Sequence, residues 1–247
     1  MRRDRVSLYS PAIGAEGELI AYGDYGRPVL AFPSEQGCCW DYEDRGMVDS
    51  IAWLLDSGRV KLYCVDSYDA GSWLAQDLEL EERARRHALY EDWILNQVVP
   101  WIRDDCGGNA DGIAVNGCSF GAFHAANFAL KRADLFPLAI CHSGVYDVTV
   151  VGGGARADAV YFNNPVDYVG NLRGDHLEWL RATVRVVLIC GRGQWEDTTG
   201  ALESTRSFAH MLGQKGLQHE MDLWGYDVPH DWPSWRAQIA HHLPRFC

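Results

Sequence analysis

The sequence predicts an α/β fold in which a mainly parallel, doubly wound sheet has helices on both faces. Short apolar runs without clean alternation recur along the chain, as is typical of strands buried on both faces. Longer segments with apolar residues at helical spacing lie between these runs, and this alternation is typical of βαβ units. Neither an internal repeat nor a linker rich in Pro, Ser or Gly interrupts the pattern. We therefore expect a single domain that spans residues 1–247.

Each expected element follows from this pattern. The apolar runs predict strands at 19–22, 29–32, 60–65, 112–116, 138–142, 184–190 and 219–224. The helical patterns predict helices at 43–57, 80–104, 120–133, 200–215 and 233–243. Gly58 is expected to end the first helix, and Pro100 to bend or interrupt the second. The stretch 143–183 is longer than a connection needs, so we expect a small lid-like insertion there.

Composition excludes several classes of protein. The net charge of −12 opposes binding to nucleic acid, whose phosphates it would repel. No apolar run is long enough to span a membrane, and the basic start MRRDRVSLYS is not followed by the apolar segment of a signal peptide. A cytoplasmic location is therefore expected.

The eight cysteines suggest buried reduced thiols and no metal site. Cys64, Cys141 and Cys190 lie inside apolar runs, and no CxxC pair occurs. His241 and His242 are adjacent within a helical pattern, which is weak evidence for a metal.

The stretch IAVNGCSFGAFHAANFALKR predicts a nucleophile elbow at Ser119. Its apolar start predicts a strand and its end a helix, with glycines two residues before and two after the serine. Such a turn strains the serine backbone, and the small residues let strand and helix approach each other. The helix N-terminus also directs N–H groups, that of Phe120 first, at an oxyanion beside Ser119.

A serine nucleophile needs a base, and five histidines lie late enough in the chain. His210, His241 and His242 fall in helical patterns and His219 begins a strand. Only His230 lies in a loop directly after a strand, from which a side chain can reach the carboxyl edge of the sheet. His230 is therefore the expected base.

The acid is expected in the loop after strand 184–190, which reads GRGQWEDTTG. Glu196 and Asp197 both qualify, and the other of the two could cap the next helix. The sequence does not separate them. Asp147, after the preceding strand, is a third candidate.

Two further parts of the site are expected at the same edge. The loop after strand 29–32 should supply a second oxyanion N–H from the segment 34–37, where Ser34, Glu35 and Gln36 are candidates. An apolar pocket for the substrate is expected from loop aromatics, chiefly Trp40, Tyr68, Trp195 and Trp232.

Four loops in this order resemble one known family. GCSFG, FPSEQG, CGRGQWED and HDWPSWR together are similar to the putative-esterase branch of the α/β-hydrolases, which includes esterase D-like enzymes, feruloyl esterases and mycolyltransferases. The likeness covers about residues 17–243. It implies a serine hydrolase that acts on small-molecule or oligomeric carboxylic esters without a cofactor. The sequence departs from the family in lacking an obvious HGGG-type oxyanion loop.

Three other interpretations are weaker. Gly152–Ala157 fits a dinucleotide-binding pattern, but Asn163-Asn164-Pro165 would stop the helix that such a motif must open. A non-catalytic binding module is disfavoured because all three triad roles have candidates. An acyltransferase would use the same triad, and the sequence does not distinguish it from a hydrolase. Neither the substrate nor the oligomeric state follows from the sequence.

Overall fold

The computed structural model describes residues 1–108, 112–154 and 157–247. Its strands form one eight-stranded sheet in the order β1-β2-β4-β3-β5-β6-β7-β8. β1 pairs antiparallel with β2, and β2 with β4, whereas every other pair is parallel. The predicted α/β class with a mainly parallel sheet is confirmed. The strands are β1 (Arg3–Ser10), β2 (Ala15–Tyr22), β3 (Arg27–Phe32), β4 (Val60–Val65), β5 (Ala114–Cys118), β6 (Leu138–His142), β7 (Arg185–Cys190) and β8 (Gln218–Leu223).

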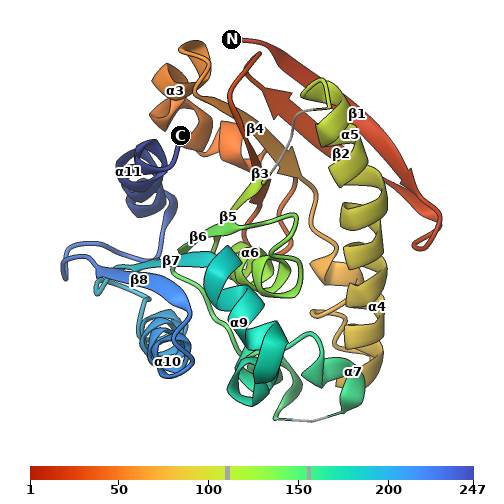
Figure 1. Ribbon diagram of the computed structural model, residues 1–247, viewed down its shortest axis with the longest axis vertical. Coiled ribbons are helices and arrows are strands. Elements are labelled where there is room, and N and C mark those ends of the chain that lie inside the picture. Colours follow the sequence, from red (N-terminus) through yellow and green to blue (C-terminus); the bar gives the residue numbers. More distant parts are fainter. Residues whose placement is uncertain (109–111, 155–156) are drawn as a thin grey trace.

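Helices cover both faces of the sheet, as predicted (Figure 1). They are α1 (Asp41–Asp44), α2 (Met47–Ser50), α3 (Ala52–Asp56), α4 (Leu80–Trp93), α5 (Val99–Asp105), α6 (Phe120–Lys131), α7 (Asp158–Tyr161), α8 (Pro165–Tyr168), α9 (Gly174–Thr183), α10 (Ala201–Gln214) and α11 (Trp232–His242). No helix among the described residues combines the length and apolar character needed to cross a lipid bilayer.

The core lies in two layers because successive side chains of a strand point to opposite faces. Leu19 and Ala21 of β2 pack in the larger cluster, with residues of α4, α6 and α10. Ile20 and Tyr22 of the same strand pack in the second cluster, with residues of α1–α3 and α11. Cys64, Cys141 and Cys190 are buried in β4, β6 and β7 as predicted, and all eight cysteines are free.

The prediction of one helix over 43–57 was wrong. Gly46 has φ +73°, a left-handed conformation that ends α1, and a second break at Ile51 separates α2 from α3. The predicted interruption of 80–104 is present. A π-helical turn, η2 (Ile94–Val98), joins α4 to α5 and ends two residues before Pro100. Proline has no N–H to continue the i→i−4 pattern, and the wider turn accommodates this.

β1 was not predicted, and neither was the first half of β2. Exposure alternates along β1, and its outward residues include Arg3, Arg5, Ser7 and Tyr9. A strand that is half exposed has no continuous apolar run, so this edge of the sheet carried no such signal.

The segment 143–183 holds η3 (Val148–Gly152), α7, α8, η4 (Val169–Asn171) and α9. Leu177 and Leu180 of α9 belong to the larger core cluster, and Val160 of α7 packs with Leu80 of α4. That this segment acts as a lid stays a prediction. Of the Gly152–Ala157 segment, residues 155 and 156 lie outside the described residues, and α7 ends before Asn163.

α6 packs against the sheet at two glycines. A Cβ on Gly117 would lie 2.0 Å from the carbonyl oxygen of Gly121, and one on Gly121 would lie 2.1 Å from that of Pro33. Real Cβ atoms do not approach backbone so closely, so both positions require glycine. These contacts bring the ends of β3 and β5 and the start of α6 together.

Gly117→Ala should therefore lower the free energy of unfolding by about 3 kcal/mol, because backbone must move to admit the methyl group. The measurement is urea denaturation at equilibrium. The control is Gly170→Ala, since a Cβ there would meet nothing within 4 Å. Equal stability of the two variants would contradict this account of the elbow.

Candidate active site

Ser119 is the single residue that connects β5 to α6, and its backbone conformation is strained. Its φ and ψ are +55° and −119°, a region that side-chain-bearing residues rarely adopt. The Ser119 N–H donates to the His142 carbonyl oxygen at 2.8 Å, which ties the turn to β6. Strain held in place by surrounding contacts is typical of a nucleophile elbow.

The imidazole of His230 contacts Ser119. His230 lies in the loop between β8 and α11, and its Nε2 is 3.0 Å from Ser119 Oγ. The His230 N–H donates to the Gln194 carbonyl oxygen at 2.9 Å, and the ring stands edge-on to Trp235 with centroids 5.1 Å apart. These contacts fix the position of the ring, and 10% of the side chain stays exposed.

Glu196 holds the other side of this imidazole. Its Oε2 is 3.0 Å from His230 Nδ1, and its side chain is fully buried. Oε1 accepts hydrogen bonds from Ser143 Oγ at 2.6 Å and from the Gly191 N–H at 3.1 Å, and Oε2 accepts one from Cys190 Sγ at 3.3 Å. Burial alone would raise the pKa of Glu196, but the hydrogen bonds from His230 and Ser143 outweigh it and lower the pKa.

The structure brings Glu196, and not Asp197, to His230. Asp197 is exposed, and its carboxylate accepts the N–H of Thr198 at 2.9 Å. Asp147 caps η3 by accepting the N–H of Thr149 at 3.0 Å. Trp195, directly before Glu196, has a left-handed backbone conformation with φ +69°.

The loop after β3 offers N–H groups beside the start of α6. Within the described residues, no hydrogen bond occupies the N–H of Ser34, Glu35 or Phe120. The Gly37 N–H donates to the Ser34 carbonyl oxygen at 2.9 Å, and the Gln36 N–H donates to Asp69 Oδ2 at 3.1 Å. Of the three loop candidates, the N–H of Gln36 is thus already engaged, whereas those of Ser34 and Glu35 remain candidates for the second oxyanion donor.

The four predicted pocket aromatics have different surroundings. Trp40 lies under the Arg5 guanidinium, 5.1 Å from it, and Trp232 stands edge-on to Tyr42 and Trp235. Trp195 is 49% exposed. That these four side chains form a substrate pocket stays a prediction.

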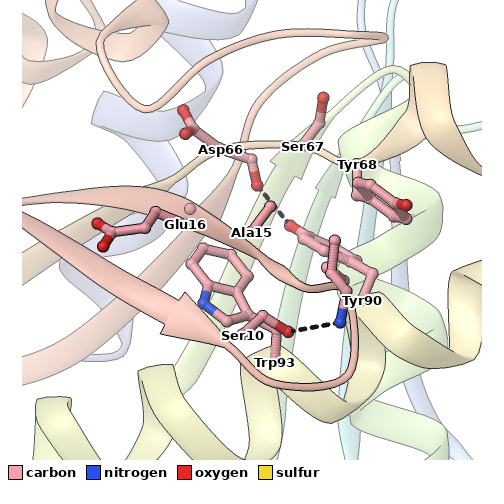
Figure 2. Close-up of a pocket in the computed structure, with 10 residues that line it drawn as sticks. Ser10, Ala15, Glu16, Asp66, Ser67, Tyr68, Tyr90 and Trp93 are labelled. Carbon is pink, nitrogen blue, oxygen red and sulfur yellow. Dashed lines mark hydrogen bonds between the residues drawn. The ribbon is translucent and has the colours of Figure 1, made fainter.

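Tyr68 instead lines a cavity of about 140 Å³ between the β1–β2 turn and α4. Figure 2 shows Ser10, Ala15, and Tyr90 and Trp93 of α4 among the residues around it. The Tyr90 hydroxyl donates to the Asp66 carbonyl oxygen at 2.8 Å (Figure 2). Ser119 is not among its lining residues.

Three supporting residues were not predicted from the sequence. Ser143 follows β6 at φ +51°, donates to Glu196, and accepts the Trp235 Nε1–H at 3.1 Å. Its signal was a serine directly after a predicted strand, one strand along from Ser119. Gly191 and Gly193 also matter, since a Cβ on either would lie within 2.7 Å of the Val228 carbonyl oxygen. These glycines let the Glu196 loop and the His230 loop approach each other.

Among the described residues, two groups of side chains have donor atoms within 4.8 Å: Asp222–His241–His242 and Glu18–Cys39–Asp66. In the first, His242 Nε2 donates to Asp222 at 2.9 Å, and its Nδ1 accepts from Arg245. In the second, Asp66 accepts the N–H groups of Glu18 and Cys39. Asp222, His242 and Asp66 are thus already engaged within the protein, which disfavours a metal at either place.

A serine on a strained strand–helix turn, followed along the chain first by a buried glutamate and then by a histidine, is the arrangement of the α/β-hydrolase class. The model of the family described as putative esterase matches residues 39–246. The chain therefore belongs to the putative-esterase family, as its loops predicted.

Solved structures agree on the fold. A ferulic acid esterase is 18% identical, with a TM-score of 0.77 over 99% of this chain and 96% of that one. An S-formylglutathione hydrolase from Agrobacterium tumefaciens is 13% identical, with a TM-score of 0.73 over 98% and 93%. One from Staphylococcus aureus is 16% identical, with a TM-score of 0.67 over 99% and 96%. Comparison with curated protein sequences gave no match.

The lowered pKa of Glu196 makes its contribution to stability depend on pH. The stabilisation is present above the ordinary carboxyl pKa of 4.5 and is lost as pH falls through the lower folded value. The stability difference between the wild type and Glu196→Gln should therefore shrink between pH 7 and pH 3.5. Urea denaturation at both pH values measures it.

Asp197→Asn is the matched control for this measurement, because Asp197 is exposed and its carboxylate accepts the N–H of Thr198. At pH 7 it should change the free energy of unfolding by less than Glu196→Gln does, because its carboxylate is exposed. A Glu196→Gln difference that grew on acidification would contradict the assigned direction of the pKa.

Proposed function

We propose that the protein is a serine esterase that hydrolyses carboxylic esters through an acyl-enzyme on Ser119. The observation that carries the proposal is the hydrogen-bonded array of Ser119, His230 and Glu196 on a strained turn. Membership of the putative-esterase family supports it. No step requires a cofactor or metal.

The first half-reaction follows from the contacts. His230 Nε2 accepts the Ser119 hydroxyl proton as Oγ attacks the ester carbonyl carbon. Glu196, ionised and buried, accepts the Nδ1–H, which fixes the tautomer and stabilises the imidazolium that forms. The imidazolium then protonates the departing alcohol oxygen as the tetrahedral intermediate collapses to the acyl-enzyme.

The developing oxyanion would lie between the start of α6 and the loop after β3. The N–H of Phe120 is one donor, and that of Ser34 or Glu35 is the other. In the second half-reaction His230 deprotonates a water, which attacks the acyl carbonyl. The imidazolium then returns this proton to Ser119 Oγ as the carboxylic acid is released.

The substrate is proposed to be a small-molecule or oligomeric ester. The net charge of −12 disfavours polyanionic esters and nucleic acid. An acyltransferase would share the first half-reaction and deliver the acyl group to an alcohol. Product analysis with and without added alcohol separates the two, since a transferase would accumulate the new ester.

Ser119→Ala and His230→Ala should each lower kcat by ~10⁴ or more, because nucleophile and base act as one unit. The assay is hydrolysis of 4-nitrophenyl acetate, and a fluorophosphonate probe should label the wild type but not Ser119→Ala. Activity of either variant within about tenfold of the wild type would refute the assignment.

Glu196→Gln should lower kcat by ~10² to 10⁴, because an amide cannot hold the required tautomer and balance the imidazolium. Asp197→Asn, one residue away, should stay within about twofold of the wild type. The same ester assay compares them. The reverse order of effects would assign the acid to Asp197.

A further inference from the structure

Asp69 is a buried carboxylate that the proposed mechanism does not use. It begins the short 3₁₀ helix η1 (Asp69–Gly71) after β4, and its side chain is 1% exposed. A buried carboxylate is costly unless hydrogen bonds and a partner compensate it. Its partners therefore indicate what the residue does.

Both oxygens of Asp69 accept hydrogen bonds. Oδ2 accepts the N–H of Gln36 at 3.1 Å, and Oδ1 is 2.8 Å from His124 Nε2. An ionised carboxylate only accepts, so the imidazole donates its Nε2–H. One carboxylate thus joins two segments that are far apart in the sequence.

The first segment is the loop that offers the second oxyanion donor. Gln36 has φ +55°, and it is the third residue of the turn closed by the Gly37 N–H and the Ser34 carbonyl. A residue with a side chain holds this left-handed conformation only where its surroundings impose it. The bond from the Gln36 N–H to Asp69 is such a constraint, and it lies next to Ser34 and Glu35.

The second segment is the first turn and a half of α6. His124 lies five residues after Ser119, and its ring stands edge-on to that of Phe120, with centroids 5.2 Å apart. The ring also contacts Phe32 of β3, Tyr90 of α4 and the stacked ring of His87. Within the described residues its Nδ1 has no hydrogen-bond partner, so the bond to Asp69 is the one polar tie of this ring.

We propose that Asp69 and His124 are a positioning pair that holds the Ser34–Gly37 loop against the start of α6 and thereby sets the oxyanion hole. The proposal rests on the proposed function. Neither residue touches the substrate in this account. The pair fixes the distance between the N–H of Phe120 on one side and those of Ser34 and Glu35 on the other.

This role predicts a specific kinetic signature. An oxyanion donor acts on charge that develops in the transition state, so displacing it lowers kcat and leaves KM nearly unchanged. Asp69→Ala should lower kcat for 4-nitrophenyl acetate by ~10², the effect of losing one such donor. Asp69→Asn keeps an acceptor for the Gln36 N–H and should recover at least about tenfold of that loss.

A trifluoromethyl ketone provides a second readout, because it forms an anionic hemiketal on the serine. Its inhibition constant should rise in Asp69→Ala by about the factor by which kcat/KM falls, as transition-state complementarity requires. A merely structural role for Asp69 would not produce this correspondence.

Asp105→Ala is the matched control. Asp105 is a largely buried carboxylate whose partner is Lys61 Nζ, at 2.7 Å. Lys61 lies at the amino end of β4, so this pair is at the edge of the sheet opposite to Ser119. It should lose stability but keep wild-type kcat per folded molecule. His124→Phe keeps the ring packing and removes the donor, so it tests the pair even where Asp69→Ala fails to fold, with kcat expected to fall about tenfold.

Wild-type kcat and inhibition constant in folded Asp69→Ala, or in His124→Phe if the former does not fold, would overturn the proposal. Failure of the proposed function looks different: the wild type would then show no ester hydrolysis and no Ser119-dependent fluorophosphonate labelling. The wild type and Ser119→Ala are therefore measured first.

Discussion

The site depends on the contact of α6 with the ends of β3 and β5, where no side chain separates backbone from backbone. Gly117 and Gly121 make this approach possible, and each leaves no room for a Cβ. Because strand and helix are so close, Ser119 must reverse the chain in a single residue at φ +55°. The same contact sets the first N–H of α6 beside Pro33 and the loop that follows it. The positions of the nucleophile and of the candidate oxyanion donors thus both follow from this backbone contact.

Two fully buried carboxylates stabilise the loops around this contact in the same way. Glu196 accepts from His230 and the Gly191 N–H, and Asp69 accepts from His124 and the Gln36 N–H. The histidines that these carboxylates bind differ in their exposure to solvent. His230 is partly exposed and touches Ser119 Oγ, so it can exchange a proton with the reaction. His124 is sealed among aromatic rings and can only hold its partner.

The sequence predicted those features that depend on chain order. The carboxyl ends of parallel strands meet at one edge of a sheet, so a serine after β5 and a histidine after β8 had to approach each other. The choice between Glu196 and Asp197 could not be predicted, because the two acids are adjacent in one loop and the path of that loop decides which of them meets His230. The Asp69–His124 pair joins residues 55 positions apart, and neither residue stands in a motif. The breaks at Gly46 and Ile51 were not predicted, because the apolar residues on both sides of them keep the spacing of one continuous helix.

The half-exposed β1 strand has a consequence for self-association. An outermost strand presents unpaired backbone N–H and carbonyl groups, to which a strand of another molecule could add. On β1 the outward side chains include Arg3 and Arg5, ion-paired with Glu43 and Glu18. An incoming strand would have to strip water from these charges and match them. These arginines are one reason why β1 lacks the apolar run that predicts a strand. They therefore also oppose the addition of a strand from another molecule to this edge of the sheet.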